Sequence, residues 1–159
     1  MKGYSSDKIR NVVLLGHGGC GKTTLVEAIA YQTGITARMG KVTDGNTISD
    51  YDKEEQKRQF SISTSVVPVE FEDIKINFLD TPGYFDFVGE VEEACHAAGA
   101  AVIVITGKSG VEVGTLKAWE LCEKYKLPRL FFVTGMDDDQ ASYRKIVLEL
   151  NDRFGRKVA

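Results

Sequence analysis

The sequence predicts a doubly wound α/β fold whose mostly parallel sheet carries an antiparallel hairpin at one edge. Two observations predict it: a hairpin formed by residues 61–71 and 74–79, and an alternation after it of apolar runs with segments of helical periodicity. A β-α-β-α-β-α order is typical of parallel strands joined by crossover helices. Ligands in such sheets bind beyond the carboxyl ends of the strands, so the loops there are the first candidates for function.

The N-terminal part predicts a strand, a helix and a long irregular segment. Residues 9–15 are predicted as a strand that ends in the apolar run 12–15, and residues 22–33 are predicted as a helix that stops near Gly34. The polar tract 34–60 is longer than ordinary connections, so we interpret it as a functional segment, with a plain disordered insertion as the alternative. Residues 52–58 are expected to form a short exposed helical turn.

Pro68 lacks an N–H donor, so the strand at 61–71 is expected at the edge of the sheet. Glu72-Asp73 make the turn to the strand 74–79. A helix is predicted over 87–98, and its apolar face consists of Val88, Val91, Cys95 and Ala98.

The C-terminal part predicts two further strands and two further helices. Residues 100–106 are continuously apolar, as a central parallel strand requires. A helix over 113–126 precedes a strand at 129–133, and a polar loop leads to a helix over 140–154. The residues of this last helix that are expected to face inward are Tyr143, Ile146, Val147, Leu150 and Phe154.

Composition and charge indicate an ordinary globular protein. The 159 residues suit one domain, and the formal net charge of −3 gives no sign of a protein that reads DNA. No apolar run approaches the roughly 18 residues that cross a membrane, and the N-terminus has no apolar signal core. We therefore expect a cytoplasmic protein that engages neither membrane nor DNA.

The segment between the first strand and the first helix carries the strongest motif. Gly16 to Thr23 reads GHGGCGKT, which fits G-x-x-x-x-G-K-[ST], the phosphate loop of P-loop NTPases. Glycines let the backbone N–H groups point inward, Lys22 reaches the terminal phosphates, and the Thr23 hydroxyl binds Mg²⁺. The expected nucleotide-binding residues are His17, Gly18, Gly19, Cys20, Gly21, Lys22, Thr23 and Thr24. The alternative is a glycine-rich turn that binds no ligand.

The three cysteines are not in metal-ligand spacing. Cys95 and Cys122 fall on apolar helix faces and are expected in the core. For Cys20 two interpretations stay open: a thiol of lowered pKa when no nucleotide is bound, or, as we prefer, a residue that contributes only its backbone N–H.

Two acidic loops give the remaining signals. Asp80 ends a buried strand, where a carboxylate can orient Mg²⁺, and the N–H of Gly83 can approach a terminal phosphate; an ordinary turn is the alternative. Asp137 follows the last strand, where a carboxylate can accept two N–H bonds from the edge of guanine. Helix capping is the alternative there, although Asp138 and Asp139 could also cap the helix.

With these residues placed, the chain resembles the nucleotide-binding core of a translational GTPase, above all elongation factor G and its elongation-factor-G-like paralogues. The resemblance covers nearly the whole chain and also rests on the segments 40–45, 52–58, 80–87 and 110–115. It implies a G domain that binds GTP or GDP with Mg²⁺ and cycles between two states on the ribosome. Residues 34–63 would be the first switch and residues 80–98 the second.

The resemblance also implies roles for single residues, some of which depart from the family pattern. Metal binding falls on Thr23, Ser61 and Asp80, and the catalytic positions are Lys22, Gly83 and Tyr84. Tyr84 stands where the family has a histidine, and tyrosine is a poor substitute for a group that positions water and carries partial positive charge. Gly18 and Gly19 replace an apolar residue and an aspartate. Thr134 and Gly135 replace the Asn and Lys that brace the loop and stack on the base, so Asp137 is expected to retain guanine preference at lower affinity.

Three functions fit these observations. The first is a ribosome-stimulated GTPase of slow intrinsic turnover, the second a guanine-nucleotide-binding module that does not hydrolyse, and the third, disfavoured by the pattern, a P-loop ATPase or kinase. Residues 1–159 are expected to be a partial G domain that lacks its last strand and the downstream domains that contact the ribosome.

Overall fold

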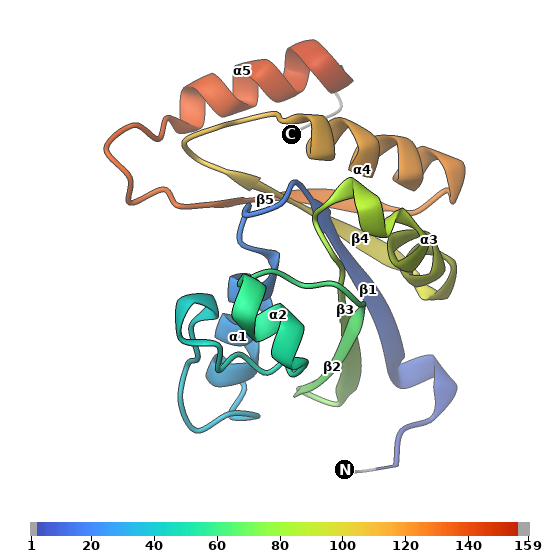
Figure 1. Ribbon diagram of the computed structural model, residues 1–159. Helices are drawn as coiled ribbons and strands as arrows, with labels where there is room; N and C mark the ends of the chain where they lie inside the picture. Colours follow the sequence, from blue (N-terminus) through green and yellow to red (C-terminus); the bar gives the residue numbers. More distant parts are fainter. Residues whose placement is uncertain (1–2, 156–159) are drawn as a thin grey trace.

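The computed structural model describes residues 3–155 of the chain (Figure 1). Over this range, the strands form one sheet in the order β2-β3-β1-β4-β5. The parallel strands are β1 (Ile9–Gly16), β3 (Ile74–Asp80), β4 (Ala100–Thr106) and β5 (Arg129–Thr134). The outer strand β2 (Ser65–Phe71) is antiparallel to β3 and contains Pro68. The predicted fold class is confirmed.

Helices cover both faces of the sheet. They are α1 (Lys22–Gln32), α2 (Lys53–Arg58), α3 (Val88–Ala97), α4 (Val113–Lys124) and α5 (Tyr143–Phe154), with short 3₁₀ turns η1 (Ser6–Lys8), η2 (Val42–Asp44) and η3 (Phe85–Phe87). Successive residues of a strand point to opposite faces. Leu14 of β1 therefore packs in a core with Val26 of α1, whereas Val13 packs in a second core with α3, α4 and α5. Figure 1 shows this separation of α1 from α3, α4 and α5.

The register of the sheet brings the loops after the strands to one edge. Leu14 pairs with Asp80, Gly16 with Val104, and Thr106 with Thr134. The loops that follow β1, β3, β4 and β5 therefore meet beyond the carboxyl ends of these strands, where ligands bind in sheets of this type.

Several predicted details are wrong. The second strand starts at Ser65 rather than Ser61, and the last helix starts at Tyr143 rather than Gln140. Tyr143 and Val88, both predicted on inward faces, are exposed. The short exposed helical turn predicted at 52–58 is present as α2, although Glu55 within it is buried. No helix within residues 3–155 has the length and apolar content needed to cross a membrane.

Candidate functional site

The loop between β1 and α1 has the tight backbone that its glycines permit. Gly19 and Gly21 have φ of 79° and 93°, values that side chains disfavour. At Gly16 a β-carbon would lie 2.4 Å from the carbonyl oxygen of Val104 and 2.8 Å from Cys20 Sγ. The loop is thus packed closely on β4, and α1 starts directly after it at Lys22.

The Lys22 side chain lies across this loop. It is only 6% exposed, and its Nζ donates hydrogen bonds to the carbonyl oxygens of Gly16 (3.2 Å) and His17 (3.1 Å). A buried ammonium group needs such partners. These carbonyl oxygens hold the positive charge at the centre of the loop, where an anion would meet it together with the N-terminus of α1.

The loop after β3 packs directly on the phosphate loop. A β-carbon at Gly83 would lie 2.6 Å from Lys22 Nζ and 2.7 Å from the α-carbon of Gly18. The Thr81 hydroxyl donates a 2.5 Å hydrogen bond to the carbonyl oxygen of Leu14, which ties this loop to β1. Only glycine at position 83 allows this approach, which places Gly83 beside the Lys22 ammonium group.

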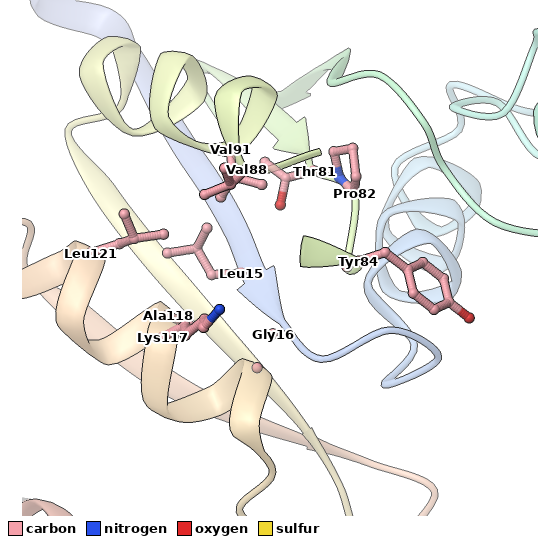
Figure 2. A pocket seen from close by; sticks show the side chains of 12 residues that line it. Leu15, Gly16, Thr81, Pro82, Tyr84, Val88, Val91, Lys117, Ala118 and Leu121 are labelled. Carbon is pink, nitrogen blue, oxygen red and sulfur yellow. The ribbon is translucent and has the colours of Figure 1, made fainter. Parts of the chain in front are cut away.

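Tyr84 leaves the loop on the side of the phosphate loop. Figure 2 shows its ring pointing away from a small apolar cavity of about 50 Å³ whose walls include Leu15, Val91 and Leu121. The ring instead lies against Gly18 and contacts Phe60, with ring centroids 4.7 Å apart. Tyr84 therefore joins the phosphate loop to the long segment 34–63.

The three predicted metal ligands gather beside Lys22. Thr23 Oγ1 lies 3.2 Å from Ser61 Oγ, and Ser61 donates a 2.7 Å hydrogen bond to Asp50. Asp80 is fully buried, accepts from the Ser49 hydroxyl (2.8 Å), and its Oδ1 has no hydrogen-bond partner among the described residues. Thr23, Ser61 and Asp50 line a cavity of about 240 Å³ together with Lys22 and Gly83. Asp80 and Ser49 are not among its lining residues.

The donor set at this point fits Mg²⁺. Hydroxyl and carboxylate oxygens are the ligands that Mg²⁺ prefers, and it retains several waters. Burial raises the pKa of Asp80 to about 6, opposed by the Ser49 and Thr23 hydroxyls and by the charge of Lys22. A nearby divalent cation would favour the ionised carboxylate and give the orphaned Oδ1 a partner. Within residues 3–155 no cluster of three or more His, Cys, Asp or Glu residues offers another metal site.

Buried carboxylates that the sequence reasoning missed fold the segment 34–63. Glu27 of α1 accepts 2.7 Å hydrogen bonds from the backbone N–H groups of Gly40 and Ile48. Glu55 accepts from the N–H groups of Ile62 (2.9 Å) and Ser63 (3.1 Å). The available signal was the position of Glu27 between Val26 and Ala30 on the inward face of α1.

On the other side of the phosphate loop, Thr134 ties the end of β5 to the loop. Its hydroxyl donates to the carbonyl oxygens of Cys20 (2.8 Å) and Ile105 (3.3 Å). A second cavity of about 340 Å³ opens here, lined by Gly19, Cys20, Gly21, Thr106, Lys108, Ser109, Thr134, Gly135 and Asp138.

In the acidic loop after β5, Asp138 faces the second cavity and Asp137 does not. Asp138 lines the second cavity and lies 3.8 Å from Lys108 Nζ, whereas Asp137 is exposed and is not one of the lining residues. Neither these residues nor Asp139 caps α5, because Ser142 is the N-cap and accepts from the N–H of Lys145. Helix capping therefore does not account for Asp137.

The three cysteines and His17 are the remaining residues that the sequence singled out. Cys95 and Cys122 are buried in the core, as predicted. Burial raises the pKa of the Cys20 thiol despite the nearby Lys22, which supports the interpretation in which Cys20 contributes its backbone. His17 Nε2 lies 3.8 Å from Glu112 Oε1, and a β-carbon at Gly114 would lie 2.4 Å from the α-carbon of His17, so α4 packs closely on the phosphate loop.

Comparisons with known proteins find a matching family and several relatives. Residues 7–159 match the family described as the elongation factor Tu GTP-binding domain. The chain is 43% identical over 153 residues to the mitochondrial ribosome-releasing factor 2 of Drosophila melanogaster, covering 96% of this chain and 20% of that protein. It is 41% identical over 150 residues to the elongation factor G-like protein of Mycobacterium tuberculosis, covering 94% and 21% respectively.

Solved structures show the same relationship. A protein of Thermus thermophilus, described as ttk003000868, superposes with a TM-score of 0.89 at 41% identity, over 93% of this chain and 22% of that one. A bacterial selenocysteine-specific elongation factor, EF-Sec, has a TM-score of 0.74 at 19% identity, over 92% of this chain and 24% of that one, which shows the shared fold. The chain thus spans about a fifth of the length of the curated relatives it matches.

Proposed function

The chain belongs to the family of elongation factor Tu GTP-binding domains, and on that premise we propose that the whole protein is a cytoplasmic translation factor of the elongation factor G type. It would hydrolyse GTP at a step on the ribosome. The observation that carries this proposal is the convergence of Lys22, Thr23, Ser61 and Gly83 on one cavity of about 240 Å³, with Asp80 buried beside it.

Phosphate binding would use the charge already held in the loop. Lys22 exchanges its two carbonyl partners for phosphate oxygens, and the N–H groups from Gly18 to Thr24 donate to the same anion. Thr134 keeps the loop in this shape through its hydrogen bond to the carbonyl oxygen of Cys20.

Thr23, Ser61 and Asp80 would hold Mg²⁺. When bound, this ion supplies positive charge to the phosphate oxygens that become more negative during the reaction. The chain's own part is to keep these oxygen donors in place, which Asp50 does for Ser61 and Ser49 does for Asp80.

Gly83 and Tyr84 set the rate in this proposal. Gly83 lies beside Lys22 and lines the same cavity, so its N–H would sense the terminal phosphate, and loss of that phosphate would release the segment after it. Tyr84 sits near the attacking water but brings a neutral phenol where an imidazole would carry partial positive charge. Slow hydrolysis follows.

A second candidate function is a guanine-nucleotide-binding module that does not hydrolyse GTP. The packing of the Tyr84 ring on Gly18 favours it, because the ring fills space above the phosphate loop without offering a base or a cation. A P-loop ATPase is disfavoured by membership of a GTP-binding family.

Single-turnover hydrolysis of GTP and of ATP by the full-length protein, with and without ribosomes, tests the proposal. Ribosome-stimulated release of phosphate from GTP supports it. GTP binding with no phosphate release would favour the second candidate, and preference for ATP would contradict both.

Two variants locate the chemistry. Lys22→Ala should lose nucleotide binding, and unchanged affinity would show that the phosphate site is assigned to the wrong residues. Tyr84→His should raise the ribosome-stimulated rate, since it restores a group that can share charge with the transition state. An unchanged rate would place Tyr84 outside the catalytic position.

A further inference from the structure

We propose that Lys108 supplies the positive charge at the nucleoside end of the nucleotide site, in place of a lysine absent at Gly135. The inference rests on the proposed nucleotide binding and extends it to a residue outside the recognised motifs. The observation behind it is that Lys108, from the loop after β4, lines the same cavity as Gly135 and Thr134, from the loop after β5.

The backbone around Lys108 is held firmly beside Gly135. The N–H of Gly107 donates a 2.7 Å hydrogen bond to the carbonyl oxygen of Thr134, and the N–H of Ser109 donates to the Thr106 hydroxyl (3.0 Å). A β-carbon at Gly107 would lie 3.0 Å from the carbonyl oxygen of Gly135. The two loops are therefore in contact, and the stem of Lys108 starts next to the position that lacks a side chain.

The cavity that Lys108 lines adjoins the phosphate site across the phosphate loop. Gly19 and Gly21 line both cavities, so a nucleotide whose phosphates lie beside Lys22 has its nucleoside directed toward the second one. Asp138, which also lines this cavity, forms an ion pair with the ammonium group, with 3.8 Å between Lys108 Nζ and Asp138 Oδ2.

The Lys108 side chain is suited to the flat face of a base. The side chain is 58% exposed, so it is accessible to a ligand. Its methylene groups can cover an apolar surface while Nζ remains hydrated. A cation over an aromatic face is attracted by the ring's electrons whichever base is present. Lys108 should thus add affinity for the nucleoside without choosing between bases.

Binding measured by calorimetry on the full-length protein tests the assignment. Lys108→Ala is expected to weaken GDP and IDP roughly tenfold each, because the contact is with the base face. Its affinity for inorganic pyrophosphate should stay that of the unchanged protein. Lys145→Ala removes a lysine at an exposed position on α5 and is the matched control, with no expected effect.

Two further variants separate charge from bulk. Lys108→Arg keeps the cation and should bind GDP like the unchanged protein, whereas Lys108→Gln should lose as much as Lys108→Ala. Full GDP affinity in Lys108→Gln, or an equal loss for pyrophosphate, would overturn the assignment. If the unchanged protein bound pyrophosphate but not GDP, the proposed function would fail first and the assignment with it.

Discussion

The ring of Tyr84 lies directly on Gly18, where a β-carbon would stand 3.0 Å from Cζ of the ring and 3.2 Å from its two Cε atoms. The resemblance of the sequence to the translational GTPases predicts that both positions depart from the family pattern, and in the structure the two residues are in contact. Phe60 closes the other side of the ring, at 4.7 Å between centroids. Neither residue can therefore be exchanged without regard to the other.

This contact predicts coupling between the two positions. Gly18→Val should destabilise the protein by about 1–2 kcal/mol, because the new side chain meets the ring at less than van der Waals distance. In a Tyr84→Ala background the same change should cost much less, and a coupling of roughly 1 kcal/mol is expected. Urea unfolding of the four proteins measures it. Additive effects would mean that the ring does not rest on Gly18.

Glu27 is expected to control the order of the segment 34–63. Glu27→Gln replaces one of its two acceptor oxygens with a donor, which leaves the N–H of Gly40 or Ile48 without a partner at about 1–3 kcal/mol. Limited proteolysis should then cut this segment faster. Glu54→Gln is the control, because the exposed pair of Glu54 with Arg58 contributes little. Equal protection of both variants would refute the role of Glu27.

The sequence predicted the layers and the site loops because those features have periodic or motif signals. Apolar runs located β1, β3, β4 and β5, and Pro68 located the edge. Hydrogen bonds from charged side chains to an irregular backbone have no such signal. Glu55, for example, lies in a segment that the sequence predicts as exposed, but in the structure it is buried and accepts hydrogen bonds from the N–H groups of Ile62 and Ser63.

The start of α5 was missed for a related reason. Three consecutive aspartates before a helix look like capping residues. In the structure Asp138 accepts a hydrogen bond from the N–H of Gln140 in a turn and forms an ion pair with Lys108, and the helix begins only after Ser142. Whether an aspartate here forms a turn or caps the helix depends on its contact with Lys108 in the loop after β4. The sequence around the helix start carries no signal for that contact.

Thr134 is expected to support nucleotide binding through the phosphate loop. Thr134→Val keeps the shape that packs near Gly21 but leaves the carbonyl oxygen of Cys20 without its 2.8 Å partner. GDP affinity should fall roughly five- to tenfold, corresponding to the loss of one hydrogen bond of about 1 kcal/mol. Thr134→Ser keeps the hydroxyl and should bind normally. Equal affinities of the Val and Ser variants would show that the loop needs no brace.

The three thiols are expected to resist alkylation in the folded protein. Burial raises the pKa of Cys95 to about 12, that of Cys122 to about 11, and that of Cys20 as well. Raised pKa values lower the thiolate fraction at pH 8, and the thiolate is the reacting form. Iodoacetamide labelling, measured by mass spectrometry, is expected only after the protein has been unfolded. Rapid labelling of Cys20 without nucleotide would instead support an activated thiol there.

Base recognition is expected to distinguish Asp137 from Asp138. Guanine offers two N–H donors to a carboxylate, whereas xanthine has an oxygen in place of the amino group. Asp137→Asn should therefore lose roughly 100-fold in GDP affinity, since two charge-assisted hydrogen bonds are changed, and should gain affinity for XDP. Asp138→Asn weakens only the pair with Lys108 and should leave the preference for guanine unchanged. A switch to XDP in Asp138→Asn and not in Asp137→Asn would move guanine recognition to Asp138, the aspartate that lines the cavity.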